Sequence, residues 1–342
     1  MNTEMTRTSN FTKNENRVLN SLLLFLLCFL LNPIFGLSAS KNIETKSLAI
    51  TQIVAHPSLD AFRKGLIDGL EKLGYSEGKN LHITFENAQG NISLAAQIAQ
   101  KFVGLDPSVI VAIGTPSAQA VLSANRDSNI PLVFGAVSDP VAANLVKDPK
   151  KPDGFVTGTM DTPSTKEHLK LMKKLVPHLK HLAVLYNPGE PNSVKQVEEL
   201  KTLKKDITIV EIPVSKSSDA LMATRTAVAK GEAIYVPLDN VVVSVIESVV
   251  KTARTDKIPV FTSEFESVKL GALATVGSSY FDQGVQTASI VAQILEGASP
   301  KSFPIEGPKK QQVYLNASSA KKLEISFPQD LLKNATVFGK LK

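Results

Sequence analysis

Cysteine is almost absent from this chain of 342 residues, and tryptophan is absent altogether. The one cysteine, Cys28, lies in an apolar run near the N-terminus and follows Leu27, where lipoprotein acylation needs a small residue. The chain beyond residue 40 therefore has no disulfide and no thiol nucleophile. An aromatic ligand would have to stack on tyrosine or phenylalanine, for which Tyr280 and Phe134 are the candidates.

Long apolar runs and recognised catalytic motifs are also missing. Beyond residue 40 no run approaches the roughly 20 apolar residues that a membrane helix needs. The motifs GxxxxGK(S/T), GxSxG and HExxH do not occur. His178 and His181 have a metal-like spacing, but no cysteine or carboxylate completes the set, so a structural role is expected. We predict neither an enzyme, nor a cofactor, nor a metal site.

Charge argues against nucleic-acid binding. The chain has 38 basic and 32 acidic residues, and its lysines are scattered over expected helices without aromatic residues between them. This pattern is typical of solvated helix faces.

The first 40 residues have the pattern of a secretory signal peptide. Arg17 precedes the apolar stretch 18–31, and small residues follow at Ser38, Ala39 and Ser40. An uncleaved anchor is the alternative, but Asn32 and Pro33 interrupt the run before it reaches spanning length. The sequence therefore predicts a soluble periplasmic protein with its signal peptide cleaved and no lipid anchor.

Residues 109–140 contain the same pattern twice: a buried strand, a glycine turn and a helix start signal. Apolar runs at 109–113 and 131–134 predict strands buried on both faces. Each is followed by a glycine and then by a capping residue before proline, Thr115 and Asp139, which predicts a helix start. In a parallel sheet such turns meet at one edge, where free N–H groups favour a carboxylate. We interpret this stretch as half of a small-molecule site.

The alternation of strand and helix runs from residue 47 and restarts after the polar linker 147–154. It predicts an α/β fold with two Rossmann-like lobes, each with a parallel sheet. The chain is expected to recross between the lobes near residues 263–275. The predicted domains are 1–40 (signal peptide), 41–155 plus 270–298 (lobe 1), and 156–269 plus 299–342 (lobe 2).

Several turns together resemble one known family. They are residues 56–60, 87–90, 114–120, 138–140, 187–193 and 238–240, with Gly277 and Tyr280. In this order they resemble the substrate-binding proteins of ABC importers typified by the tryptophan and aromatic amino-acid binders, over about residues 47–335. The resemblance implies a type I periplasmic-binding fold with a ligand cleft at the hinge, and an ABC permease in the inner membrane as partner.

An amino-acid-like solute would need a carboxylate site and an ammonium site. Thr115 and Ser117, at a helix start, suit the carboxylate. We predict that Asp239 holds the ammonium from the opposite lobe, with Asp139 as the second candidate. The alternative for either aspartate is that it only caps its helix. The full expected set is His56, Leu59, Thr115, Ser117, Ser138, Asp139, Asn187, Glu190, Ser193, Asp239, Asn240 and Tyr280.

The predicted function is delivery of a small amino-acid-like solute, possibly aromatic, to an ABC permease by a monomeric exported protein. Two alternatives are a periplasmic ligand-binding sensory module and a binder of a nucleoside-like solute. An enzyme is a third class, against which the missing thiol and motifs count.

The signal-peptide interpretation predicts a mature N-terminus at Ala39 or Lys41, because small residues precede both positions. N-terminal sequencing of periplasmic material checks this. Retention of Met1 would contradict it.

Overall fold

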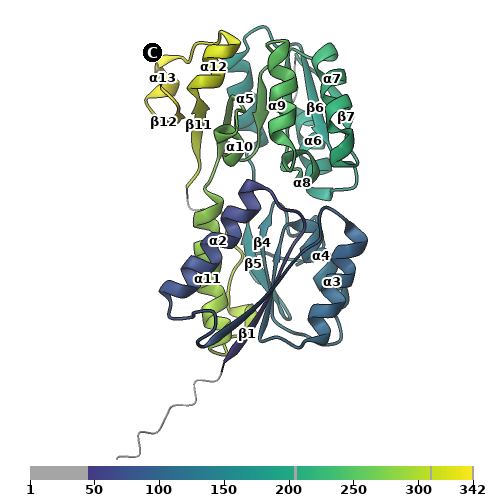
Figure 1. Cartoon of the computed structure of the whole chain (residues 1–342), viewed down its shortest axis with the longest axis vertical. Coiled ribbons are helices and arrows are strands. Elements are labelled where there is room, and N and C mark those ends of the chain that lie inside the picture. The colour runs from purple at the N-terminus through teal and green to yellow at the C-terminus, as the bar shows by residue number, and fades with distance from the viewer. Residues whose placement is uncertain (1–44, 204–205, 309, 341–342) are drawn as a thin grey trace, which may run out of the picture. The chain divides into compact units, whose positions relative to one another are not determined.

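The computed structural model describes residues 45–203, 206–308 and 310–340, all within one compact unit, Glu44–Lys342. The expected signal peptide lies outside the described residues. Two sheets form the framework, one of five strands and one of seven. We call them, with their helices, the first and the second lobe (Figure 1).

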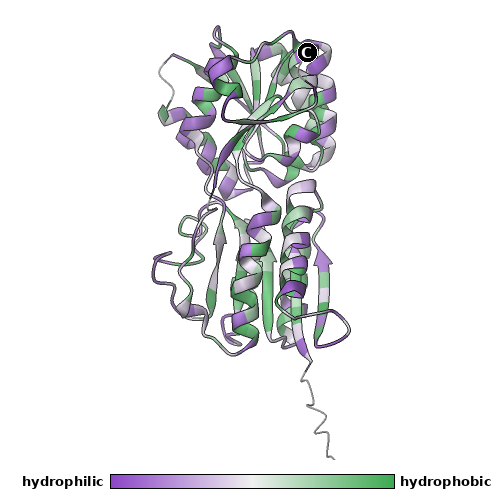
Figure 2. Cartoon of the chain, turned by 90° about the vertical axis from the view of Figure 1, so that its left-hand side faces the viewer, coloured by the Kyte–Doolittle hydropathy of each residue, from purple (hydrophilic) through white to green (hydrophobic). Residues whose placement is uncertain are grey.

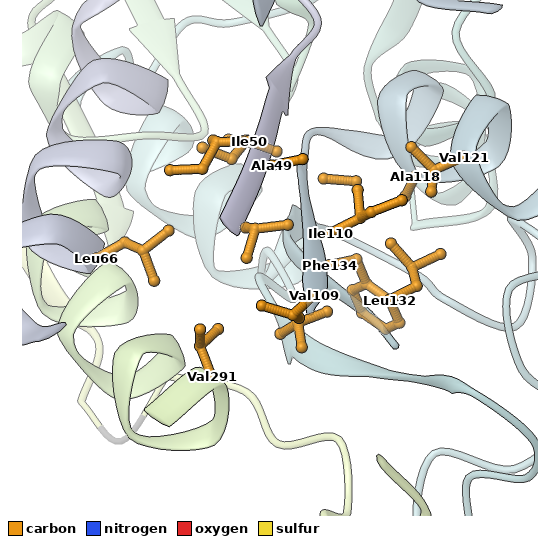
Figure 3. Packing of buried hydrophobic residues seen from close by; sticks show 14 of the residues in the cluster. Ala49, Ile50, Leu66, Val109, Ile110, Ala118, Val121, Leu132, Phe134 and Val291 are labelled. Atoms are coloured by element: carbon orange, nitrogen blue, oxygen red, sulfur yellow. The ribbon is translucent and has the colours of Figure 1, made fainter. Parts of the chain in front are cut away.

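The first lobe has a parallel sheet in the order β2-β1-β3-β4-β5. Its strands are β1 (Lys46–Gln52), β2 (Leu81–Asn87), β3 (Val109–Ile113), β4 (Leu132–Val137) and β5 (Val156–Met160). Its helices are α2 (Pro57–Lys72), α3 (Ile92–Gly104), α4 (Thr115–Ala124) and α11 (Tyr280–Leu295). Leu66 of α2 and Val291 of α11 pack on one face of the sheet, and Ala118 and Val121 of α4 on the other (Figure 3).

The second lobe has a sheet in the order β12-β11-β10-β9-β8-β6-β7, in which only the β10–β11 pair is antiparallel. Its strands are β6 (His181–Tyr186), β7 (Thr208–Pro213), β8 (Ala233–Val236), β9 (Val260–Thr262), β10 (Ala274–Gly277), β11 (Gln312–Asn316) and β12 (Ala335–Phe338). Its helices are α5 (Thr165–Leu175), α6 (Pro191–Leu203), η1 (Ser217–Asp219), α7 (Ala220–Lys230), α8 (Asn240–Val243), α9 (Ile246–Thr255), α10 (Glu266–Lys269), α12 (Ala317–Leu323) and α13 (Gln329–Leu332). The short turn η2 (Pro300–Ser302) precedes β11 and packs on β5 of the first lobe.

Apolar residues concentrate in the strands, while the helices carry both apolar and hydrophilic residues (Figure 2). The strand β3 is an example. All five of its residues are buried, as expected for a strand covered by helices on both faces of the sheet. Within the described residues, no helix has both the length and the apolarity to cross a bilayer.

Sheet membership differs from the expected domain boundaries at two strands. The strand β5 pairs with β4 and thus extends the first sheet beyond residue 155. The strand β10 pairs with β9 in the second sheet, so the chain recrosses to the first lobe only at α11 rather than at residue 270. Backbone hydrogen bonds, which the local sequence pattern does not reveal, decide both assignments.

Two expected helix starts are wrong in detail. Gly114 occupies the N-cap position of α4, so Thr115 is its first residue and not its cap. Asp139 accepts hydrogen bonds from the backbone N–H groups of Val141 and Ala142, yet no helix follows it. The chain makes turns there instead, and Asn144 adopts a left-handed φ of 55° that ends them.

The helices α2 and α11 approach closely through glycine. A Cβ atom at Gly284 would lie 2.1 Å from the carbonyl oxygen of Phe62, and one at Gly65 would lie 2.0 Å from that of Phe281. Neither position has room for a methyl group, so these glycines set the distance between the helices. This contact holds α11 in the first lobe, between the crossing from β10 and the crossing to β11.

Gly284→Ala is therefore expected to lower the free energy of unfolding by about 1–3 kcal/mol through overpacking, although alanine favours helices. Gly104→Ala at the end of α3 is the matched control, because nothing lies within 4 Å of its Cβ position. Urea unfolding measures both. Equal midpoints for Gly284→Ala and the wild type would show that the helices do not touch there.

Candidate functional site

The carboxyl ends of strands from both sheets meet around one small cavity, as is usual for ligand sites in parallel α/β proteins. We call it the cleft cavity. It is lined by His56, Leu59, Thr115, Ala136, Ser138, Asn192, Leu238, Asp239, Asn240, Val243, Glu264 and Tyr280. No lysine or arginine is among these described residues, whereas two carboxylates are. The cavity is therefore an acidic environment with hydroxyl groups on its first-lobe side.

The start of α4 supplies the first-lobe hydroxyl groups. Gly114 has a φ of 92° and no side chain to cap the first-turn N–H groups of α4. The hydroxyl groups of Thr115 and Ser117 are buried, and neither has a hydrogen-bond partner among the described residues. Buried polar groups are normally paired, so these two mark a place where a ligand acceptor is expected.

The end of β4 carries a strained residue beside this helix start. Ala136 lines the cleft cavity with a φ of 54°, at an irregularity in the pairing of β4 with β5. Such a conformation costs a non-glycine residue about 1–3 kcal/mol and is concentrated at functional sites. Ser138 follows it on the cavity wall, whereas Asp139 lies outside the cavity and forms an ion pair with Lys195 of α6.

Asp239 organises the second-lobe wall. Its carboxylate accepts from the backbone N–H of Val242 at 2.9 Å and from the hydroxyl of Ser193 at 2.6 Å. The backbone N–H of Asn187 also donates to it. Asp239 therefore caps α8, as one of the two sequence interpretations expected, and ties the 187–193 turn to β8.

Glu190 holds the neighbouring groups from the opposite side. It accepts from the backbone N–H of Asn240 at 3.0 Å, from the side-chain amide of Asn240, and from the N–H of Val241 at 3.2 Å. It is 2% exposed and is not among the lining residues. Asn187, Glu190 and Ser193 thus support the wall rather than form its surface.

The burial of these groups shifts their titration. Burial, and then the nearby charge of Asp239, raise the pKa of Glu190 to about 8 against the hydrogen bonds that lower it. Burial also raises the pKa of Asp239. Burial lowers the pKa of His56 to about 4, so this ring is neutral at neutral pH. Its Nδ1 accepts from the N–H of Leu59, which leaves the proton on Nε2, 3.5 Å from Oδ1 of Asn240.

Among the residues that the structure describes, three polar contacts join the two lobes across the cleft. They are His56 with Asn240, Lys195 with Asp139, and the hydroxyl of Ser58 donating to Glu264 at 2.6 Å. Each connects a strand end or helix start of one lobe to the other. The geometry is that of a binding cleft whose walls are held together by side chains.

One expected role is not supported by the structure. Phe134 is fully buried in the core of the first lobe and cannot stack on a ligand at the cleft (Figure 3). His181 pairs with Glu232 on the surface, with 3.1 Å between Nδ1 and Oε1. Among the described residues, no cluster suited to a metal ion is present.

Sequence reasoning missed Glu264 and Asn192. Glu264 follows β9 just as Asp239 follows β8, so its place after a parallel strand was the available indication. Asn192 lies inside the expected turn 187–193, and its Nδ2 donates to the carbonyl of Leu238 at 2.6 Å. Its Oδ1 has no partner among the described residues.

This fold and cleft define a two-lobe solute-binding protein. A sequence model of the family described as ABC transporter substrate binding protein matches residues 47–338, and the chain belongs to that family. Proteins of this family bind a small molecule, work with a membrane permease and are typically extracytoplasmic. The protein is thus a solute-binding component of an ABC transporter.

The chain is also similar to individual proteins and solved structures whose names state a ligand or a function. A tyrosine-binding protein of Clostridioides difficile strain R20291 is 40% identical over 284 residues, 82% of this chain and 82% of that protein. A Streptococcus pneumoniae structure in complex with L-Trp is 34% identical, covers 86% of this chain and 99% of its own, and has a TM-score of 0.81. A ligand-free, open structure from Clostridium difficile, of a substrate-binding protein with adhesive properties, is 38% identical with the same coverage but scores 0.63. The expected type I periplasmic-binding fold and family are confirmed.

The raised pKa of Glu190 predicts a pH dependence of stability. A carboxyl group with a higher pKa in the folded chain stabilises the fold less as pH rises from its unfolded value, here 4.5, to about 8. Glu190→Gln lacks this titration. We expect its unfolding free energy to improve relative to the wild type between pH 5 and pH 8, measured by urea unfolding. If the unfolding free energies of the two proteins changed with pH in parallel, the raised pKa of Glu190 would be contradicted.

Proposed function

We propose that this protein binds a free amino acid, with an aromatic side chain favoured, and delivers it to an ABC permease. The observation that carries the proposal is the uncapped start of α4, where the buried hydroxyl groups of Thr115 and Ser117 have no hydrogen-bond partner among the described residues. Thr115 lines the cleft cavity, and Ser117 lies behind it in the first turn of the same helix. A ligand carboxylate would accept from these hydroxyl groups and from the first-turn N–H groups. Similar proteins bind tyrosine or L-Trp, which supports the same ligand class.

The opposite wall suits the ammonium group. Asp239 and Glu264 line the cleft cavity from the second lobe, and no described lining residue supplies a positive charge. A zwitterion placed between α4 and this wall would satisfy both lobes at once. Binding would then stabilise the contact between the lobes, because only the closed form meets both ends of the ligand.

Ligand entry requires the lobes to separate. The cleft cavity encloses about 20 Å³, room for about one water molecule. An amino acid therefore enters an opened cleft and is released when the cleft reopens at the permease. The family assignment does not favour the sensory-module and nucleoside alternatives.

Export completes the proposal. We propose that residues 1–40 direct secretion and are removed, leaving a monomeric periplasmic protein. Leu27 before Cys28 supports a protein without a lipid anchor. An aromatic ligand side chain would pack against Tyr280, which lines the cleft cavity, because Phe134 is fully buried in the core.

Thr115→Val tests the carboxylate site. Loss of one hydrogen bond to the ligand carboxylate is expected to weaken L-tyrosine or L-tryptophan binding by about tenfold to a hundredfold in calorimetric titration. The melting temperature without ligand should not fall, because the Thr115 hydroxyl has no partner to lose.

Thr51→Val is the matched control. The Thr51 hydroxyl is likewise buried and unpartnered, but it lies in β1 and does not line the cleft cavity. This variant should leave affinity unchanged. Equal affinities for wild type and Thr115→Val would remove the Thr115 hydroxyl from the binding site.

A further inference from the structure

Glu264 and Asp239 both line the cleft cavity, but they are used differently. The hydrogen bonds to Asp239 come from its own lobe, from Val242, Ser193 and Asn187. Burial of these oxygens among backbone donors makes Asp239 a support for the second-lobe wall. Glu264 instead accepts from Ser58 of α2 in the first lobe, at 2.6 Å, as well as from Ser267.

Other buried acidic and polar side chains lie close enough to Glu264 to be affected by its charge or to share its surroundings. Oε2 of Glu266 and Oε1 of Gln283 are buried and have no partner among the described residues. Asp161 has hydrogen bonds with Tyr280, Gln283 and Ser278, and burial, with a smaller contribution from the charge of Glu264, still raises the pKa of Asp161 to about 6. We call Asp161, Glu264, Glu266, Tyr280 and Gln283 the hinge cluster.

The hinge cluster lies at the crossings between the lobes. Asp161 directly follows β5, and Tyr280 opens α11, where the chain returns from β10 to the first lobe. The charge of Lys269 acts on Glu266. The Lys269 ammonium lies over the ring of Phe265, 4.3 Å from its centroid. Lys269 does not line the cleft cavity. The cluster thus presents the carboxylate of Glu264 to the cavity, and no lysine or arginine among the described lining residues balances its charge.

From this geometry we infer that Glu264 binds the ammonium group of the solute, with Tyr280 beside it, and that Asp239 is a positioning residue. The inference rests on the proposed function and narrows the ligands to α-amino acids with a free ammonium. The Ser58 contact makes Glu264 the point where recognition of the ammonium and closure of the lobes coincide.

The test compares L-tyrosine with 3-(4-hydroxyphenyl)propionate, which lacks only the ammonium group, by titration calorimetry on the mature protein. The wild type is expected to prefer L-tyrosine by about tenfold to a hundredfold, the value of a charge-assisted hydrogen bond. Glu264→Gln should reduce that preference to near one by weakening L-tyrosine binding alone. A preference retained in Glu264→Gln overturns the inference.

Two variants separate the ammonium contact from a structural role. Ser58→Ala removes the cross-lobe donor and should weaken both ligands by one factor, with the preference kept. Asp239→Asn should likewise weaken both ligands together. A preference lost in Asp239→Asn would overturn the inference even if Glu264→Gln did not fold.

Wild-type binding separates this inference from the proposed function. If the wild type binds neither L-tyrosine nor L-tryptophan, the proposed function fails, and the inference fails with it. If the wild type binds them with the expected preference and Glu264→Gln keeps that preference, only the inference fails. The matching pair L-tryptophan and indole-3-propionate repeats the comparison with a second ring.

Discussion

Burial of Glu190 and Asp239 among backbone N–H groups is the interaction on which the cleft depends. Between them these carboxylates hold the 187–193 turn, the start of α8 and the side chain of Asn240. Two neighbouring buried carboxyl groups are costly to ionise, which raises the pKa of both, and the donors that offset this cost are the wall itself. The wall is therefore rigid before any ligand arrives, and Asn240 is correctly oriented toward His56.

The first lobe offers the opposite chemistry. Its contribution is the uncapped start of α4, two unpaired hydroxyl groups and the strained residue Ala136. Free donors on one wall and surplus acceptors on the other match the two ends of a zwitterion. This complementarity explains why a single small solute can stabilise the closed arrangement, since either wall alone satisfies only half of it.

The connections between the lobes place charge at the hinge. Asp161 leaves the first sheet after β5, and Tyr280 begins α11, which glycine contacts with α2 hold in the first lobe. The acidic residues of the hinge cluster consequently lie at the crossings, where a change in lobe angle alters their surroundings most. In the proposed binding mode, recognition and closure share the same side chains for this reason.

Local sequence was sufficient for the elements whose pattern is local. Apolar runs such as 109–113 give strands buried on both faces, and the motif turns at 114–120 and 238–240 lie at the cleft as expected. Partners distant in sequence needed the tertiary structure. Glu264 meets Ser58 across 206 positions, and the sheet of β5 follows from its hydrogen bonds to β4. Whether a polar group is paired or left free depends on such distant neighbours, so local sequence named Thr115 as a cap while the folded chain leaves its hydroxyl free.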